Sequence, residues 1–417
     1  MNRDQHPAPA ARKSGFCKRS RDERDPIYHE PIHKSEPIER PLPKKGSVDF
    51  PFLMITAALV LFGCVMVYSA SSVFAEVHHD DNTYFIARHL FFLLMAVGFT
   101  ALVVNFCTPK FWRDFGYVLF GVSVVLLILV LLVGTDLNSG AKRWLDLKVV
   151  TLQPSEIAKL ALVLTLARFM SDHQKKILSE HRFGGNFKYG VFYPGILIAT
   201  LILLVAAEKH ISGIMIIGMI GVAVMFLGGT RIRWIVGIGC VIVGAACVLV
   251  LVSEYAQARV MTWINIEDAD PLGSAWQTLQ GLMAIGSGGL FGTGLGNSRQ
   301  KYGFVSQPQN DFIFTIVCEE LGFIGALLVI ALFVAFVWRG FYIARHCPDK
   351  CSALIVYGLS FKVALQVILN IAVVTNSMPN TGIALPFFSY GGTSLMLQIF
   401  EVGIILSISR YASHKKI

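Results

Sequence analysis

Long apolar runs dominate this chain from Phe50 onward and constrain its fold more than any other feature. A helix that crosses a bilayer needs roughly 20 mostly apolar residues, and about ten runs come close to that length or exceed it. Apolar residues make up 54% of the chain and charged residues only 15%, against about 25% charged in soluble proteins. A helical bundle in water would not need so many such runs. The sequence therefore predicts an all-α polytopic membrane protein with about ten transmembrane helices.

The predicted spans are joined by short polar connections, except for a long polar segment after the seventh. The spans cover residues 50–71, 90–106, 115–134, 156–170, 191–207, 211–229, 234–252, 312–337, 353–374 and 383–409. Residues 1–49 are rich in proline and charge, so we expect a disordered cytoplasmic tail there. The membrane domain is expected to cover residues 50–412, with an extracytoplasmic loop at 253–310 between the seventh and eighth spans and a short cytoplasmic tail at 413–417.

The lysines and arginines predict the orientation of the chain. With the N-terminus in the cytoplasm, 26 of the 36 Lys and Arg residues lie on the cytoplasmic side, eight lie outside and two lie within spans. Cytoplasmic loops of membrane proteins carry an excess of these residues, so both termini are predicted to be cytoplasmic. The same distribution accounts for the net charge of +9 without nucleic acid as a partner.

The tail and the cysteines argue against two other classes of protein. Residues 1–49 are polar, and the first apolar run is too long and too late for a cleavable signal peptide. Most of the eight cysteines lie in or beside apolar runs and behave as small hydrophobic residues. Cys347 and Cys351 do not have the spacing of a CxxC motif, so no metal or redox pair is expected.

The connection between the third and fourth spans carries polar residues that the bilayer does not explain. Lys142 and Arg143 could hold phosphate oxygens, and Trp144 could stack on a sugar. The alternative is an interfacial aromatic residue beside cations that reach toward the headgroups. Ser155 resembles a helix N-cap. Lys159, one turn into the fourth span, is expected to face the bundle interior.

A second polar group joins the fifth and sixth spans, where Glu208, Lys209 and His210 lie together. Two opposite charges and an imidazole suit either a proton relay or a structural ion pair at a turn.

A third group lies in the long outer segment. Arg259, Gln277 and Gln280 precede a run that holds six glycines between Gly286 and Gly296. Because glycine allows left-handed backbone and close approach, such a run can form a nest of N–H groups for an anion. It can equally be a set of tight turns.

Asp311 ends the outer segment immediately before the eighth span. A partly dehydrated carboxylate there would have a raised pKa and would suit a general base, or it could be a helix-start residue favoured by the macrodipole. Glu319 and Glu320 lie two turns deeper and need partners. Lys362 is the candidate partner for one of them.

The ninth span places Lys362, Gln366 and Asn370 on one face, because they recur every four residues. Residues 379–394 follow, with prolines, paired glycines and Ser389. Broken helix at membrane depth is tolerated where it lines a cavity. The sequence therefore predicts a polar site inside the bundle, for either transport or chemistry.

Four motifs in this order resemble the SEDS family (shape, elongation, division, sporulation), and the resemblance covers the chain after Phe50. The motifs are residues 140–159, 284–297, 311–325 and 379–392, together with Tyr68-Ser-Ala-Ser71. Residues 294–301 and the Pro379-Asn-Thr-Gly-Ile stretch are more similar to FtsW-type than to RodA-type members. The resemblance implies a SEDS-type helix bundle.

The resemblance also implies an activity: a peptidoglycan glycosyltransferase of the inner membrane that polymerises lipid II into glycan strands outside, for septal wall synthesis in cell division. It implies a class B penicillin-binding protein, a transpeptidase, and other divisome proteins as partners. Asp311 would be the family's essential acid. The expected substrate contacts are Lys142, Arg143, Trp144, Arg259, Gln277, Gln280, Gly288, Lys362, Asn370 and Ser389. No metal ligands are expected, and a divalent cation such as Mg²⁺ or Mn²⁺ is left open.

Two stretches depart from the family pattern. Members usually read Leu-Pro-Glu-x-His-Thr-Asp before the catalytic aspartate, whereas this chain has Gln307 and Gln309 in place of the glutamate and histidine. At the outer turn the usual Gln/Glu-Pro-Asp-Leu-Gly is Glu208-Lys-His-Ile-Ser, so His210 replaces an acid. Asp311 is left as the main candidate base.

The residues favour a single inverting displacement, in which Asp311 takes the proton of the acceptor 4-hydroxyl while Arg143, Lys142 and Arg259 stabilise the departing pyrophosphate. A retaining mechanism would need a second carboxylate as nucleophile. A lipid II flippase also fits a polar bundle interior, but it needs charge through the bundle depth rather than at the outer mouth. A non-catalytic division scaffold needs no charged mouth.

Overall fold

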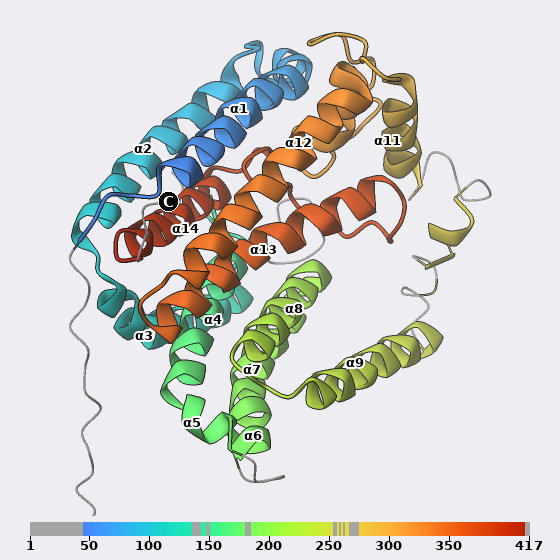
Figure 1. Ribbon diagram of the computed structural model, residues 1–417. Coiled ribbons are helices and arrows are strands. Elements are labelled where there is room, and N and C mark those ends of the chain that lie inside the picture. The colour runs from blue at the N-terminus through green and yellow to red at the C-terminus, as the bar shows by residue number, and fades with distance from the viewer. Residues whose placement is uncertain are drawn as a thin grey trace, which may run out of the picture. The chain divides into compact units, whose positions relative to one another are not determined.

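The computed structural model (Figure 1) describes residues 45–135, 143–146, 151–179, 185–252, 257, 260–261, 263–266 and 275–412, without the side chains of 241–243, 245–247 and 249–250. The described part is almost entirely helical. Its helices are α1 (Phe50–His79), α2 (Tyr84–Phe106), α3 (Pro109–Val133), α4 (Pro154–Asp172), α5 (Gln174–Ile177), α6 (Gly185–Phe187), the π-helix η1 (Lys188–Phe192), α7 (Tyr193–Ala207), α8 (Ile211–Leu227), α9 (Ile232–Val252), α11 (Trp276–Ser287), α12 (Ile313–Arg345), α13 (Lys350–Val374) and α14 (Gly392–Ser409).

Each of the ten predicted spans coincides with a helix. Within the described residues, seven helical stretches have the length and apolarity of a membrane span, and α8 is a shorter apolar helix. The remaining two predicted spans are α4 and α9. The predicted start of the tenth span at Ile383 is wrong, because residues 383–391 form a turn and α14 begins at Gly392. The predicted outer segment also contains a helix, α11.

Local sequence signals set several helix ends. The Asp49 carboxylate accepts a hydrogen bond from the Phe52 N–H at 3.0 Å and so caps α1. Asp349 caps α13 in the same way through the Ser352 N–H, at 2.9 Å. Such caps satisfy backbone donors that have no partner within the helix. Gly322 interrupts α12 with φ 67° and ψ −168°, a conformation that favours glycine.

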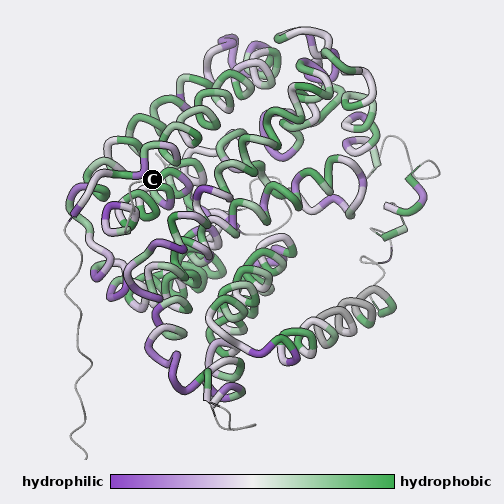
Figure 2. The backbone as a smooth tube through the Cα atoms, in the orientation of Figure 1, coloured by the Kyte–Doolittle hydropathy of each residue, from purple (hydrophilic) through white to green (hydrophobic). Residues whose placement is uncertain are grey.

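The helix α4 lies at the centre of the bundle. Every side chain from Ala158 to Ala167 is buried, because α3, α7, α8, α13 and α14 all pack against this helix. The arrangement shields Glu156 and Lys159 of α4 from lipid, where they would be costly. Figure 2 shows the hydrophobic colouring along the long helices and the hydrophilic colouring concentrated at their ends and in the connections.

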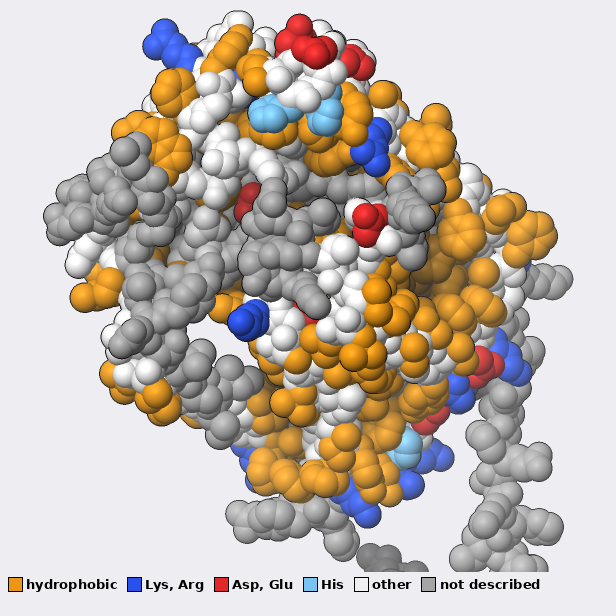
Figure 3. Space-filling view, turned by 180° about the vertical axis from the view of Figure 1, so that it is seen from behind, with side chains coloured by type: hydrophobic (Ala, Val, Ile, Leu, Met, Phe, Trp, Pro, Cys, Tyr) orange, Lys and Arg blue, Asp and Glu red, His pale blue; other side chains and the backbone are white. Residues whose placement is uncertain are grey.

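The outward faces of the helices are apolar, as a bilayer requires. Exposed hydrophobic side chains include Leu61 on α1, Leu94 on α2, Leu132 on α3 and Trp338 on α12. In Figure 3, hydrophobic side chains cover much of one face, while Lys and Arg gather toward its lower end.

The only strands in the described residues form a small hairpin before α4. Strand β1 (Leu145–Asp146) pairs antiparallel with β2 (Thr151–Leu152), and Leu145 lies opposite Leu152. The Thr393 hydroxyl donates to the Thr151 carbonyl at 2.8 Å, which ties this hairpin to the first turn of α14.

Candidate active site

Asp311 lies just outside the first turn of α12, and its side chain does not cap that helix. The N-cap position belongs to Phe312, which makes no side-chain capping bond. The Asp311 carboxylate instead lies beside the backbone of Gly382, where an added Cβ would stand 3.4 Å from Oδ2. Burial raises the pKa of Asp311 above its ordinary value. A carboxyl group with a raised pKa binds a proton more readily than a free aspartate, as a general base requires.

Asn370 fixes two backbone segments, the one that carries Asp311 and the turn at Ile383 that lies beside it. Its side-chain amide donates to the Asp311 carbonyl and to the Ile383 carbonyl, each at 2.7 Å. The side chain is 1% exposed. One amide group thus joins α13 to the start of α12 and to the turn that precedes α14, two segments far apart in the sequence.

The turn between α13 and α14 is built as predicted, from broken helix with its own hydrogen bonds. The Ser389 hydroxyl accepts from the Leu385 N–H at 2.7 Å, and the side-chain amide oxygen of Gln398 accepts from the Phe387 N–H at 2.8 Å. The Tyr390 N–H donates to the Gln309 carbonyl at 2.8 Å. Ser389 therefore holds the turn that lies beside Asp311, and its hydroxyl is engaged with backbone.

Arg143 belongs to the connection between α3 and α4, and its side chain contacts the turn between α7 and α8. Its guanidinium donates to the carbonyls of Lys209 at 2.6 Å and of Glu208 at 3.5 Å. Trp144 is half-buried, and its carbonyl accepts from the Thr135 N–H at 2.9 Å. The turn reaches the neighbourhood of Asp311, because the Ser212 hydroxyl donates to the carbonyl of Thr381, the neighbour of Gly382.

The same turn carries two titratable groups without an ion pair between them. Both carboxylate oxygens of Glu208 are buried and have no hydrogen-bond partner in the described part of the chain. Burial raises the pKa of Glu208 to about 8, although Arg143 opposes this shift. Burial, with Lys159 and Arg143, lowers the pKa of His210 to about 4. The His210 Nδ1 lies 3.4 Å from the Ser155 hydroxyl.

The predicted cap at Ser155 is therefore wrong. The N-cap of α4 is Gln153, which makes no side-chain capping bond, and Pro154 occupies the first turn. Proline suits that position because it lacks the N–H that a cap would satisfy.

A buried ion network lies deeper in the bundle. The Lys159 ammonium lies 2.5 Å from Glu156, and the Lys362 ammonium lies 2.5 Å from Glu401 and 3.9 Å from Glu156. Two cations and two carboxylates balance in charge, as a low-dielectric interior demands. Lys159 faces the bundle, as predicted. The predicted pairing of Lys362 with Glu319 or Glu320 is wrong, because Glu401 on α14 lies nearer to it.

The glycine run packs directly against α12, and no anion nest is needed to explain it. An added Cβ at Gly288 would stand 1.9 Å from the Cys318 carbonyl oxygen, and one at Gly292 would stand 2.2 Å from the Glu320 carbonyl oxygen. Only glycine allows this approach of two backbones. Gly288 is thus held against α12.

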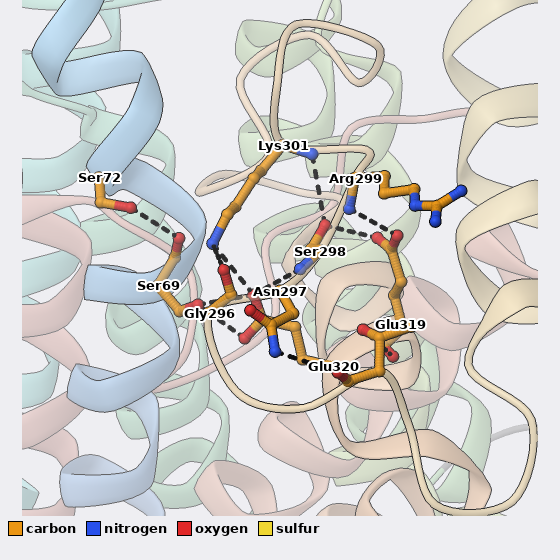
Figure 4. Close-up of polar contacts among 10 residues, drawn as sticks. Ser69, Ser72, Gly296, Asn297, Ser298, Arg299, Lys301, Glu319 and Glu320 are labelled. Carbon is orange, nitrogen blue, oxygen red and sulfur yellow. Dashed lines mark hydrogen bonds and ion pairs between the residues drawn. The ribbon is translucent and has the colours of Figure 1, made fainter.

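Glu319 and Glu320 find their partners in the segment that follows the glycine run (Figure 4). Glu319 accepts from the Ser298 hydroxyl at 2.5 Å and from the Arg299 N–H at 2.8 Å. Glu320 accepts from the Ser69 hydroxyl at 2.7 and 2.6 Å and lies 3.4 Å from the Lys301 ammonium. Both glutamates are essentially fully buried.

The remaining predicted contacts lie apart from Asp311 or outside the described residues. Gln277 on α11 donates to the Ser306 carbonyl at 3.1 Å. Gln280 on the same helix is buried, and α11 packs against α12. Lys142 and Arg259 lie outside the described residues. Within the described ranges, no three His, Cys, Asp or Glu side chains converge as metal ligands.

The structure thus brings Asp311, Asn370 and the turn at Gly382 together, and Arg143 contacts the adjoining turn between α7 and α8. Sequence reasoning missed Glu156, Glu401, Ser298 and Lys301 as functional candidates. The charge of Glu401 inside an apolar run was the available signal for the first ion network.

Comparisons with known proteins agree with this architecture. Residues 50–414 match the family model for the cell cycle proteins FtsW, RodA and SpoVE. The chain is 39% identical to stage V sporulation protein E of Bacillus subtilis (strain 168) over 89% of this chain and 99% of that protein. It is 37% identical to the probable peptidoglycan glycosyltransferase FtsW of Trichlorobacter lovleyi, over 87% of this chain and 93% of that protein.

Solved structures are similar over nearly the same range. A chain from a structure titled "Structural coordination of polymerization and crosslinking by a peptidoglycan synthase complex" has a TM-score of 0.72 at 25% identity, over 87% of this chain and 98% of that one. The rod shape determining protein RodA of Thermus thermophilus gives a TM-score of 0.64 at 25% identity, over 88% of this chain and 98% of that one. The chain belongs to the FtsW, RodA and SpoVE family of multi-pass membrane proteins, the SEDS family.

Proposed function

We propose that this protein is a peptidoglycan glycosyltransferase that polymerises lipid II into glycan strands at the outer face of the cytoplasmic membrane. The observation that carries the proposal is the half-buried, non-capping carboxyl of Asp311 beside Gly382. Relatives named as probable peptidoglycan glycosyltransferases support the reaction class.

The proposed reaction is one inverting displacement. Asp311 accepts the proton of the acceptor sugar's 4-hydroxyl while that oxygen attacks the anomeric carbon of the donor. The bond from the anomeric carbon to the lipid pyrophosphate breaks, and the pyrophosphate leaves with the bonding electron pair. Arg143, with Lys142 and Arg259, stabilises its charge. Mg²⁺ or Mn²⁺ would arrive with the pyrophosphate, and chelation by EDTA during the assay tests that requirement.

The deciding experiment is polymerisation of lipid II by purified protein, with and without its transpeptidase. General-base catalysis contributes about 10²–10⁴-fold, so Asp311→Asn should abolish detectable glycan while membrane insertion survives. A near wild-type rate in that variant would make Asp311 structural. Asparagine caps a helix about as well as aspartate, so the substitution also separates base from cap.

A lipid II flippase is the second candidate, favoured by the ion network of Glu156, Lys159, Lys362 and Glu401 in the bundle depth. These charges pair with one another, whereas a flippase needs charge available to a headgroup. Headgroup transfer in vesicles that hold the Asp311→Asn variant tests this candidate separately from polymerisation.

The setting of the reaction belongs to the same proposal. We place the protein in the inner membrane with both termini in the cytoplasm, from the distribution of 26 and eight Lys and Arg residues. A class B penicillin-binding protein as partner is supported by the similarity to a peptidoglycan synthase complex. A septal role, with other divisome proteins, follows from the FtsW-like motifs. Reporter fusions at each terminus and localisation of a labelled chain test these points.

A further inference from the structure

The outer end of α12 is a short piece of helix detached from the rest. Gly322 is non-helical, with φ 67°, so the turns from Ile313 to Leu321 are not continuous with the long remainder of the helix. Asp311 lies two residues before this outer piece, next to its N-cap residue Phe312. The position of Asp311 therefore depends on whatever fixes the outer piece, and not on the straightness of α12.

The glycine run supplies hydrogen-bond partners for the backbone groups of α12 that the break leaves unpaired. In an unbroken helix the carbonyls of residues 319 and 320 would accept from the N–H groups of residues 323 and 324. Here those two carbonyls accept from Thr293 and Gly294, at 2.9 and 3.0 Å. The Phe323 and Ile324 N–H groups donate to Gly289 and Leu290, at 2.9 and 3.2 Å. All four groups freed by the break are satisfied by the loop.

Side chains then connect this contact between the glycine run and α12 to α1. Glu320 is 0% exposed and receives the Ser69 hydroxyl of α1, the Lys301 ammonium and, at 3.4 Å, the Ser298 N–H. In Figure 4 these groups converge on Glu320 from the helix on one side and the loop on the other, while the Arg299 side chain extends away. Lys301 also donates to the Gly296 carbonyl at 2.6 Å.

The contacts of Glu320 close a ring that contains Asp311. The chain leaves the cluster at Lys301, runs through the outer segment to Asp311, enters the outer piece of α12 and returns to the cluster at Glu320. We propose that Glu320, with Ser69 and Lys301, is a positioning cluster that sets where Asp311 stands relative to α1. The inference rests on the proposed function, and it gives the Tyr68–Ser71 motif a role.

The test compares two serines of α1 in the full-length protein. Ser69→Ala removes the hydroxyl that bonds Glu320. Ser72→Ala is the matched control, because within the described residues that hydroxyl donates only to the Ser69 carbonyl, at 3.2 Å. We expect Ser69→Ala to lower kcat for lipid II polymerisation about tenfold or more, since small misplacements in an active site have effects of that size, with KM nearly unchanged. Ser72→Ala should behave as wild type.

The pH profile distinguishes positioning from loss of fold. Burial raises the pKa of Asp311, so a displaced and better hydrated Asp311 should shift the acid limb of the activity profile toward lower pH in Ser69→Ala. A second pair of variants removes the charges. Lys301→Met leaves Glu320 buried without its cation, and adding Glu320→Gln should recover part of kcat.

The possible results separate the two proposals. A wild-type protein that makes no glycan from lipid II contradicts the proposed function. An active wild type whose Ser69→Ala and Ser72→Ala variants share the same kcat and the same acid limb contradicts the positioning role alone, as does a double variant no more active than Lys301→Met.

Discussion

The side-chain amide of Asn370 donates to the backbone carbonyl of Asp311 at 2.7 Å and leaves the Asp311 carboxylate free to act. The same amide reaches Ile383 at 2.7 Å, so the two segments that flank the carboxylate share one donor group. A catalytic carboxylate must be held in place, but not by a charged partner that neutralises it. A hydrogen bond to the backbone holds the residue and adds no such partner.

Replacing Asn370 by leucine should therefore impair catalysis more than folding. The substitution keeps the volume but leaves two carbonyls without their donor, each a loss of about 1–3 kcal/mol for buried groups. We expect kcat to fall at least tenfold in the lipid II assay. Gln366→Leu is the control, because Gln366 is also buried on α13 and its amide oxygen has no partner among the described residues. Equal losses in both variants would contradict the role given to Asn370.

Arg143→Lys should be harmful although it preserves the charge. The planar guanidinium reaches two backbone carbonyls of the outer turn and can engage pyrophosphate oxygens in pairs, whereas an ammonium acts as a point charge. We expect turnover to fall by about tenfold or more. Arg299→Lys is the control, since the Arg299 side chain extends away from Glu319 and Glu320. Wild-type turnover in Arg143→Lys would remove Arg143 from the anion site.

Glu208 should make the protein less stable as the pH rises from about 6.5 to 8. A carboxyl whose pKa is raised to about 8 in the folded state holds a proton that the unfolded chain releases near pH 4.5. Stability therefore falls by about 1.4 kcal/mol per pH unit in that range. Burial lowers the pKa of His210 to about 4, so its contribution to stability rises with pH up to about pH 6.5. Below that pH the rise from His210 cancels the fall from Glu208.

Thermal unfolding across pH 4 to 9 checks this expectation. Glu208→Gln should lose the decline above about pH 6.5 and should instead gain stability with pH below it, from His210 alone. An unchanged profile in Glu208→Gln would show that Glu208 titrates normally.

Residues 1–44 should be dispensable, whereas residues 45–49 should contribute to stability. The composition of residues 1–44 cannot form a core, so their deletion should leave polymerisation unchanged. Residues 45–49 are tied to the bundle: Gly46 bonds Arg410, and the Asp49 carboxylate pairs with Arg339 at 2.8 and 2.9 Å. Asp49→Ala should lower stability by at least roughly 1 kcal/mol, from the lost helix cap alone. Lipid II polymerisation by the deletion variant checks the first expectation, and a loss of activity in that folded variant would contradict it. Denaturant unfolding of Asp49→Ala checks the second, and stability equal to that of the wild type would contradict it.

Much of the fold could be predicted from the sequence because the signals are local. A run of apolar residues determines a span wherever its neighbours lie, and a four-residue spacing determines that Lys362 and Asn370 share a face. The position of Asp311 before a span predicted a partly dehydrated carboxyl. The glycine run predicted close backbone approach, but its partner could not be identified from spacing.

The pairing of buried charges was decided by tertiary structure alone. Lys362 had several acids within reach by span order, and only the packing of α13 against α14 and α4 selected Glu401 and Glu156. Glu320 meets Ser69 across 251 residues of sequence. A buried charge takes whichever partner the packed helices bring within hydrogen-bond distance, because the low dielectric penalises every alternative. The sequence by itself determined that these charges need partners, and the crossing of the helices determined which ones they have.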